Sequence, residues 1–358
     1  MPMLTTPSTQ LPVQPLDAAV GSAIAAPDLA SHTAREPAYA TVLVGEAANV
    51  AARAFDDGDP AALDIAHRAM YQLYSLAMWS PIDAPRHNEH DLTLASVLQA
   101  LEAGFERSLA RIELPEAPPV EAAEFAAWLE RLVLDEPPLP DSGFGAYLRE
   151  TITLDQMRDI VAMRSLFFLK EPDPWAMVIP SLRGPAKAGL IDVLLDEYGW
   201  GRYDHMHSTV YEVLMERLGL DTGYDAYLDR TVHQFLAVLN YQGLLARHRR
   251  LCRRMYGYIY LVEAESPQAM QSYLAAFDRL GVADPDIRRF YDLHVTADED
   301  HQRVALEEMI TPVVRDEPEA RHEIARGVLG GQHLEDAFAR HLLDRFRLGR
   351  SALRTVAA

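Results

Sequence analysis

The sequence contains a single cysteine, Cys252, among its 358 residues. One cysteine excludes an internal disulfide and a cluster of thiolate metal ligands, and it fits a reducing compartment. Long apolar runs are also absent, because no stretch approaches the roughly 18 consecutive apolar residues that a membrane-spanning helix needs. The first residues carry neither the basic nor the apolar region of a secretory signal. We therefore expect a cytoplasmic protein.

Positive charge is scarce as well. The sequence has 33 Lys and Arg residues against 53 Asp and Glu residues, for a formal net charge of −20. Such a surface repels phosphate backbones and anionic lipids, so we expect no nucleic-acid partner and no membrane partner. The chain also lacks a phosphate-binding glycine loop, a Gly-x-Ser-x-Gly motif and a Cys-x-x-Cys motif. Its hydrophobic fraction of 49% is enough for a sizeable core.

Apolar residues recur at spacings of three and four, which is typical of helices, and no segment alternates with the period of a strand. The pattern therefore predicts an all-α bundle. The predicted helices cover residues 42–54, 60–79, 91–112, 153–169, 186–198, 206–218, 224–239, 247–264, 267–280, 285–309 and 334–348.

Proline-rich passages suggest where one part of the chain ends and the next begins. Residues 1–35 are rich in Pro, Ala, Ser and Thr without sustained periodicity, and we expect them to be disordered. Residues 36–120 form a predicted accessory helical region, which ends after the prolines of residues 114–119. Residues 121–358 form the main predicted domain.

Residues 294–301 carry His294, Asp298 and His301 on a stretch without Gly or Pro. An offset of four leaves two side chains about 40° apart around a helix, and an offset of seven leaves them about 20° apart. All three side chains therefore share one face. Imidazole with carboxylate suits iron or manganese, and zinc remains open. The alternative is a solvated acidic face with incidental histidines.

A second group of candidate ligands lies upstream. Glu197 closes a predicted helix, a Gly-Trp-Gly sequence follows it, and Asp204 and His207 share one face of the next helix. Glu171 follows an apolar helical run. Each residue also has a purely structural explanation: a helix-end carboxylate for the two glutamates, a helix cap for Asp204 and a core histidine for His207.

Taken together, these residues resemble the heme-oxygenase-like diiron oxidases and oxygenases, also called iron-containing redox enzymes. The family pattern is a first Glu, a second Glu some ten residues before a His around a glycine-rich bend, and a late His-x3-Asp-x2-His helix. The similar part of the chain covers roughly residues 145–350. The resemblance implies a heme-oxygenase-like seven-helix bundle with an N-terminal helical extension, binding two iron ions rather than heme.

The resemblance also implies a set of metal ligands. Some N-oxygenating members have an extra carboxylate ligand between the second Glu and its His, where Asp204 falls; a helix cap is the other explanation for Asp204. The implied ligands, which are also the implied catalytic residues, are Glu171, Glu197, His207, His294, Asp298 and His301.

What the resemblance implies about activity is an O2-dependent oxidoreductase with two Fe(II)/Fe(III) ions and an external reductant. Family substrates are typically small amino acids, their derivatives or fatty acids in natural-product pathways. The leading hypothesis is N-oxygenation of an amino acid or a derivative. The first alternative is C–H activation, meaning desaturation, cyclisation or C–C cleavage, and the second is a non-catalytic helical binding protein. An electron donor and a second copy in a homodimer are the expected partners. Arg183, Arg202 and Arg164 are candidates to meet a substrate carboxylate.

Overall fold

The computed structural model describes residues 14–78, 88–134 and 143–355. These residues form helices and turns without any strand, which confirms the predicted all-α class. The chain divides into two compact units, Met1–Arg111 and Ile112–Ala358. The boundary therefore lies close to residue 111 rather than at residue 120. None of the helices in the described ranges combines the length and the apolar character that crossing a membrane would require.

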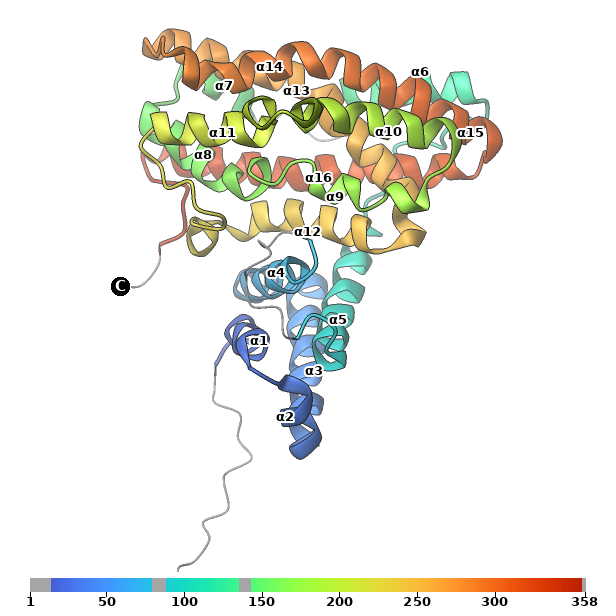
Figure 1. Cartoon of the computed structure of the whole chain (residues 1–358), viewed down its shortest axis with the longest axis vertical. Helices are drawn as coiled ribbons and strands as arrows, with labels where there is room; N and C mark the ends of the chain where they lie inside the picture. The colour runs from blue at the N-terminus through green and yellow to red at the C-terminus, as the bar shows by residue number, and fades with distance from the viewer. Residues whose placement is uncertain (1–13, 79–87, 135–142, 356–358) are drawn as a thin grey trace, which may run out of the picture. The chain divides into compact units, whose positions relative to one another are not determined.

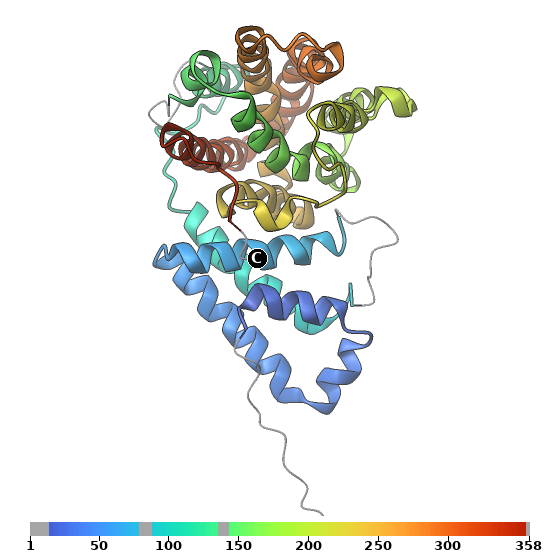
Figure 2. The ribbon, with the colours of Figure 1, turned by 90° about the vertical axis from the view of Figure 1, so that its left-hand side faces the viewer.

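The first unit is a small group of helices that pack on one another (Figure 2). The side chains of Asp59 and Asp91 accept hydrogen bonds from backbone N–H groups in the first turns of α4 and α5, which explains where these two helices begin. The unit contains α1 (Leu16–Ala25), α2 (Leu29–Arg35), α3 (Pro37–Ala51) with a π-helical turn (Ala52–Asp56), α4 (Pro60–Ser75) and α5 (Leu92–Leu109).

The predicted disorder of residues 1–35 is wrong for residues 14–35, which form α1 and α2. Leu16 and Val20 of α1 are buried at helical spacing, and α1 packs against α4. The amide of Asn88 donates hydrogen bonds to the backbone oxygens of Ala23 and Ala26. The oxygen of Ala23 also accepts from the N–H of Ala26, and the Asn88 amide adds further donors at this end of α1. Residues 1–13 lie outside the described residues.

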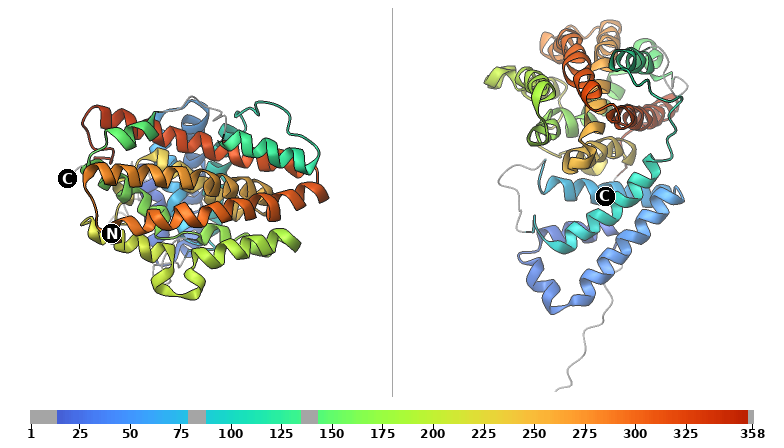
Figure 3. Two further views of the ribbon diagram at one scale, coloured as in Figure 1. Left: turned by 90° about the horizontal axis from the view of Figure 1, so that it is seen from above. Right: turned by 90° about the vertical axis from the view of Figure 1, so that its right-hand side faces the viewer.

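The second unit is built on long helices that lie side by side (Figures 1 and 3). Its central helix is α13, which packs against α14 on one side and α16 on the other. The unit contains α6 (Ala122–Leu134), α7 (Phe144–Glu150), α8 (Leu154–Phe168), α9 (Asp173–Ala176), α10 (Gly184–Glu197), α11 (His207–Arg217), α12 (His233–Arg247), α13 (Cys252–Leu280), α14 (Pro285–Arg303), a π-helical segment (Val304–Ile310), α15 (Thr311–Asp316) and α16 (Ala320–Arg347).

Three helices differ most from their predicted bounds. The two helices predicted over 247–264 and 267–280 are one helix, α13, which continues through Pro267. The missing N–H of a proline costs one helical hydrogen bond, and packing on both sides of α13 offsets that cost. Helix α16 begins at Ala320 rather than at residue 334, and α12 begins at His233 rather than at residue 224.

Two glycines bring α13 and α16 into backbone contact. A methyl group added at Gly257 of α13 would overlap the carbonyl oxygen of Ile324, and one added at Gly327 of α16 would overlap the carbonyl oxygen of Arg254. Because neither residue has a side chain, the two helices approach until their backbones touch. This contact fixes the distance and the rotation between them.

We expect Gly257→Ala and Gly327→Ala each to lower the stability of the protein by about 1–3 kcal/mol, because overpacking forces the two backbones apart. Gly45→Ala in α3 is the matched control, since an added methyl there meets no atom within 4 Å. Thermal unfolding followed by circular dichroism measures the effect. Melting temperatures of Gly257→Ala and Gly327→Ala equal to that of the unmodified protein would show that this contact is not tight.

Candidate metal centre

Seven buried carboxylate and imidazole side chains converge inside the second unit, each at most 6% exposed. Glu171 follows α8, Glu197 is the last residue of α10, and His207 is the first residue of α11. The other four lie within helices: Glu263 on α13, and His294, Asp298 and His301 on α14. The offsets of four and seven residues on α14 do bring its three side chains to one buried face.

The Gly-Trp-Gly bend brings Glu197 and His207 together. Gly199 has a φ of 60°, and a methyl group there would lie 2.5 Å from the backbone nitrogen of Met206. Only glycine allows this close return of the chain. The bend starts α11 at His207, whose Nδ1 atom lies 2.8 Å from Oε2 of Glu197.

The seven side chains form two groups that share one carboxylate. In each group, one ligand atom per residue lies within 4.8 Å of the others. The first group is Glu197, His207 and His294, with Oε2 of Glu171 3.8 Å from Nε2 of His294; the second group is Glu197, Glu263, Asp298 and His301. Oε2 of Glu197 faces His207, and its Oε1 lies 3.4 Å from Nδ1 of His301. Glu197 is therefore common to both groups and presents one oxygen to each.

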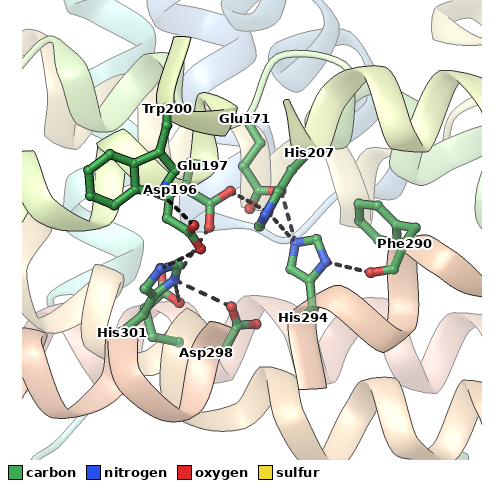
Figure 4. A network of polar contacts seen from close by, with 10 residues as sticks. Glu171, Asp196, Glu197, Trp200, His207, Phe290, His294, Asp298 and His301 are labelled. Carbon is green, nitrogen blue, oxygen red and sulfur yellow. Dashed lines mark hydrogen bonds and ion pairs between the residues drawn. The ribbon is translucent and has the colours of Figure 1, made fainter. Parts of the chain in front are cut away.

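Contacts outside the cluster orient two of the histidines. Nδ1 of His294 lies 2.7 Å from the backbone oxygen of Phe290, so it carries the proton and donates, which leaves Nε2 free to bind a metal (Figure 4). Nε2 of His301 lies 3.3 Å from Oδ2 of Asp196, so Nδ1 of His301 is the free nitrogen. Trp200 donates a hydrogen bond of 3.1 Å to Asp196 and holds it in place.

Burial and mutual repulsion change the protonation of these groups. Burial raises the pKa of Glu171 and that of Glu197 to about 7, and it raises the pKa of Glu263 to about 8. Burial lowers the pKa of His207 to about 4. For His294, burial acts downward, but the facing carboxylates of Asp298 and Glu171 raise the pKa to about 10. Without metal ions, protons therefore balance the negative charge of the buried carboxylates.

The residues present fit metal ions. One oxygen each of Glu171, Glu197, Glu263 and Asp298 is buried without a hydrogen-bond partner among the described residues. Buried oxygens without donors are costly unless a cation meets them. The four carboxylates carry four negative charges when ionised, which two divalent cations would balance. Carboxylate and imidazole donors without thiolate suit iron or manganese.

Asp204 is not in the cluster. Its side chain is 71% exposed and lies near those of Arg202 and His205. The helix-cap alternative is not met either, because α11 begins at His207 with Met206 in the capping position. A short turn between the bend and α11 leaves Asp204 on the surface. The additional buried carboxylate is Glu263, which sequence reasoning missed. The available signal was a glutamate after the apolar run 255–262, but no spacing linked it to the other candidates.

A cavity of about 230 Å³ adjoins the cluster, and Glu171, Glu197, Glu263, His294 and Asp298 form part of its wall. Much of the remaining wall is apolar and aromatic, including Phe167, Phe168, Tyr211, Phe235 and Tyr291.

The three candidate arginines lie in different places. Arg164 lines the cavity and forms two hydrogen bonds with Glu335, of 3.0 and 2.8 Å. The side chain of Arg183 is 91% exposed and that of Arg202 is 62% exposed, and neither residue lines the cavity. Only Arg164 of the three is therefore placed to meet a molecule bound beside the cluster.

Comparison with known proteins shows which sequences this chain resembles. The profile of a family described as iron-containing redox enzyme matches residues 158–336, half of the chain. Nitrosourea synthase from Streptomyces achromogenes subsp. streptozoticus is 28% identical over 165 residues, which is 45% of this chain and 34% of that protein. The alignment thus spans about a third of the length of this relative.

The contrast between Glu263 and Asp204 gives the first prediction for this site. Glu263→Gln should weaken the binding of one ferrous ion, because a charged metal ligand is lost. Loss of a residue that only contacts a ligand costs roughly 10–100-fold in metal affinity, and we expect a larger effect here. Asp204→Asn is the control, and it should leave iron binding unchanged. Anaerobic titration with iron analysis measures both. Equal loss of iron in the two variants would contradict the assignment.

The raised pKa values of three carboxyl groups give the second prediction for this site. Because the pKa values of Glu171, Glu197 and Glu263 lie near 7 or 8 without metal, these groups are largely protonated below that range. Metal must displace the protons, so the affinity for Fe(II) should rise between about pH 6 and about pH 8. Anaerobic calorimetry in buffers with different ionisation enthalpies should detect proton release near pH 6.5. Heats that do not depend on the buffer would refute this coupling.

Proposed function

Because the chain belongs to the iron-containing redox enzyme family, we propose that it is an O2-dependent non-heme diiron oxygenase that oxidises a nitrogen atom of an amino acid or an amino-acid derivative. The observation that carries this proposal is the shared carboxylate of Glu197, with one oxygen toward His207 and the other toward His301. A mononuclear site has no need of such a carboxylate. Two metal ions explain it directly.

The donors divide between two ions. Glu171, His207 and His294 would hold one ion, and Glu263, Asp298 and His301 would hold the other, with Glu197 common to both. Two iron ions held there would supply the redox chemistry with O2, and an external reductant would restore their electrons.

The surrounding groups keep the donors ready to bind. The Phe290 carbonyl keeps the proton of His294 on Nδ1, and Asp196 keeps the proton of His301 on Nε2. The free nitrogens thus stay directed into the cluster.

The cavity beside the cluster gives a substrate a place to bind. The aromatic side chains of Phe167, Phe168 and Tyr211 line it next to Glu171 and His294. This apolar wall would exclude water from the space beside the ligands, which leaves that space to a bound substrate.

The extra carboxylate of N-oxygenating family members was expected between Glu197 and His207, at Asp204, and the exposed Asp204 gives no support for nitrogen as the oxidised atom. The observation that favours nitrogen is the similarity to one relative. The relative that aligns with this chain is named for the synthesis of a nitrosourea, a compound that contains an oxidised nitrogen. Its alignment covers 34% of that protein, so its whole activity is not carried over.

We expect anaerobic titration to saturate near two iron ions per chain, and a screen of free amino acids with ferrous iron and O2 to find one that triggers O2 uptake and gains oxygen on nitrogen. His301→Ala should abolish the uptake and keep the helical content, because a donor is lost and no helix is broken. The matched control is His205→Ala, whose side chain is 44% exposed. Product masses and an oxygen electrode read the outcome. Loss of two hydrogens from the substrate would establish C–H oxidation instead, and saturation at one ion would remove the diiron proposal.

A further inference from the structure

The cavity has a second polar region, formed by Arg164, Gln242, Glu265 and Glu335. None of these residues belongs to the two ligand groups. We call this second polar region the charged end of the cavity.

The charged end and the cluster lie at opposite edges of one face of helix α13. Glu263 and Glu265 are two residues apart, so their side chains leave the helix about 200° apart. Both residues line the cavity, with Val262, Ser266, Ala269 and other residues of the same face between them. Glu263 reaches His301 on α14, at 3.2 Å, and Glu265 reaches Gln332 on α16, at 3.4 Å. The cavity thus extends across one face of α13, with a carboxylate at each edge.

Glu265 is a carboxylate in need of a cation. Its one hydrogen bond within the described ranges is the contact from Gln332, and it forms no ion pair there. A second carboxylate, that of Glu335, lines the same cavity. The only cation of the charged end, Arg164, already donates both of its terminal nitrogens to Glu335. A bound ammonium group would supply the missing positive charge.

The unpaired amide oxygen of Gln242 is a second, independent observation that favours a ligand with N–H donors. Gln242 on α12 is 1% exposed and lines the cavity, and its side-chain oxygen has no hydrogen-bond partner among the residues described. A buried amide oxygen without a donor is costly, and an N–H group of a bound ligand would satisfy it. The charged end therefore offers two acceptors, Glu265 and Gln242, to a ligand that carries N–H donors.

Arg164 adds a site for the opposite charge. Its guanidinium group lies between the rings of Phe235 and Phe338, at 5.1 and 5.3 Å, and its pairing with Glu335 fixes its orientation. A guanidinium group has five N–H donors, so the pairing with Glu335 leaves some of them free for a second anion. An ammonium site beside a guanidinium matches a zwitterion.

We propose that the charged end binds the α-ammonium and α-carboxylate groups of an amino acid, whose side chain then crosses the face of α13 and presents its far end to the metal cluster. Glu265 and Gln242 bind the ammonium group, and Arg164 binds the carboxylate. This inference rests on the proposed function, and it narrows the substrate to an amino acid that is oxidised on its side chain and not at the α-nitrogen.

The test measures binding without chemistry. The full chain, loaded with Fe(II) in the absence of O2, is titrated with each proteinogenic amino acid by calorimetry. The tightest binder is then compared with its analogue lacking the α-ammonium group and its analogue lacking the α-carboxylate. Each analogue should bind about tenfold more weakly or worse, because a charged group of the cavity wall loses its partner.

Glu265→Gln separates recognition from folding. It should bring the affinity ratio between the amino acid and its analogue without the ammonium group close to one, while iron content and melting temperature stay at or above those of the unmodified protein. The exposed Glu216→Gln on α11 is the matched control and should keep the full ratio. The double variant Arg164→Gln/Glu335→Gln removes both members of the ion pair together, and it should abolish the discrimination against the analogue without the carboxylate.

Three results would overturn the inference: no amino acid binds, the analogue without the ammonium group binds as tightly as its parent, or Glu265→Gln retains the full ratio. Failure of the proposed function is read separately, from iron content and O2 uptake. Zwitterion binding without O2 uptake would support the amino-acid site at the charged end and contradict the proposed oxygenase function. O2 uptake with an unchanged ratio in Glu265→Gln would do the reverse.

Discussion

The second unit depends on the burial of four carboxylates in one small volume with three imidazoles. Carboxylates at such distances repel one another, and burial removes the water that would screen them. The raised pKa values of Glu171, Glu197 and Glu263 express this cost. Either protons or metal cations must balance the charge. Long helices packed on both sides hold these groups together against the repulsion.

Much of the site was predictable because its residues follow local rules. The offsets of four and seven on α14 place His294, Asp298 and His301 on one face, and the structure has them there, all buried. The Gly-Trp-Gly sequence predicted a bend between Glu197 and His207, and Gly199 and Gly201 do adopt positive φ values there. In both cases the information lies within about a dozen residues. Helical geometry alone is enough to convert that information into a position.

The predictions that failed concern residues whose positions depend on contacts between distant parts of the chain. Glu263 joins the cluster because α13 packs against α14, a pairing that no local spacing reveals. Asp204 was at the expected distance along the chain, but the turn before α11 leaves it exposed. Pro267 suggested a break in α13, and packing with α14 and α16 keeps the helix continuous. The composition of residues 14–35 suggested disorder, although a short apolar stripe on α1 and the amide of Asn88 order it.

The backbone contact at Gly257 and Gly327 constrains how this protein could diverge. It fixes the rotation of α13 against α16, and Glu263 and Glu265 leave α13 on opposite edges of one face. A rotation that brought one carboxylate deeper into the cavity would withdraw the other, so the two ends cannot be adjusted independently by moving this helix. Mutations that reshape the cavity while keeping this packing would therefore replace side chains of its wall, such as Val161 of α8, Val238 of α12 and Val262 of α13. Divergence would change those side chains and leave the two glycines in place.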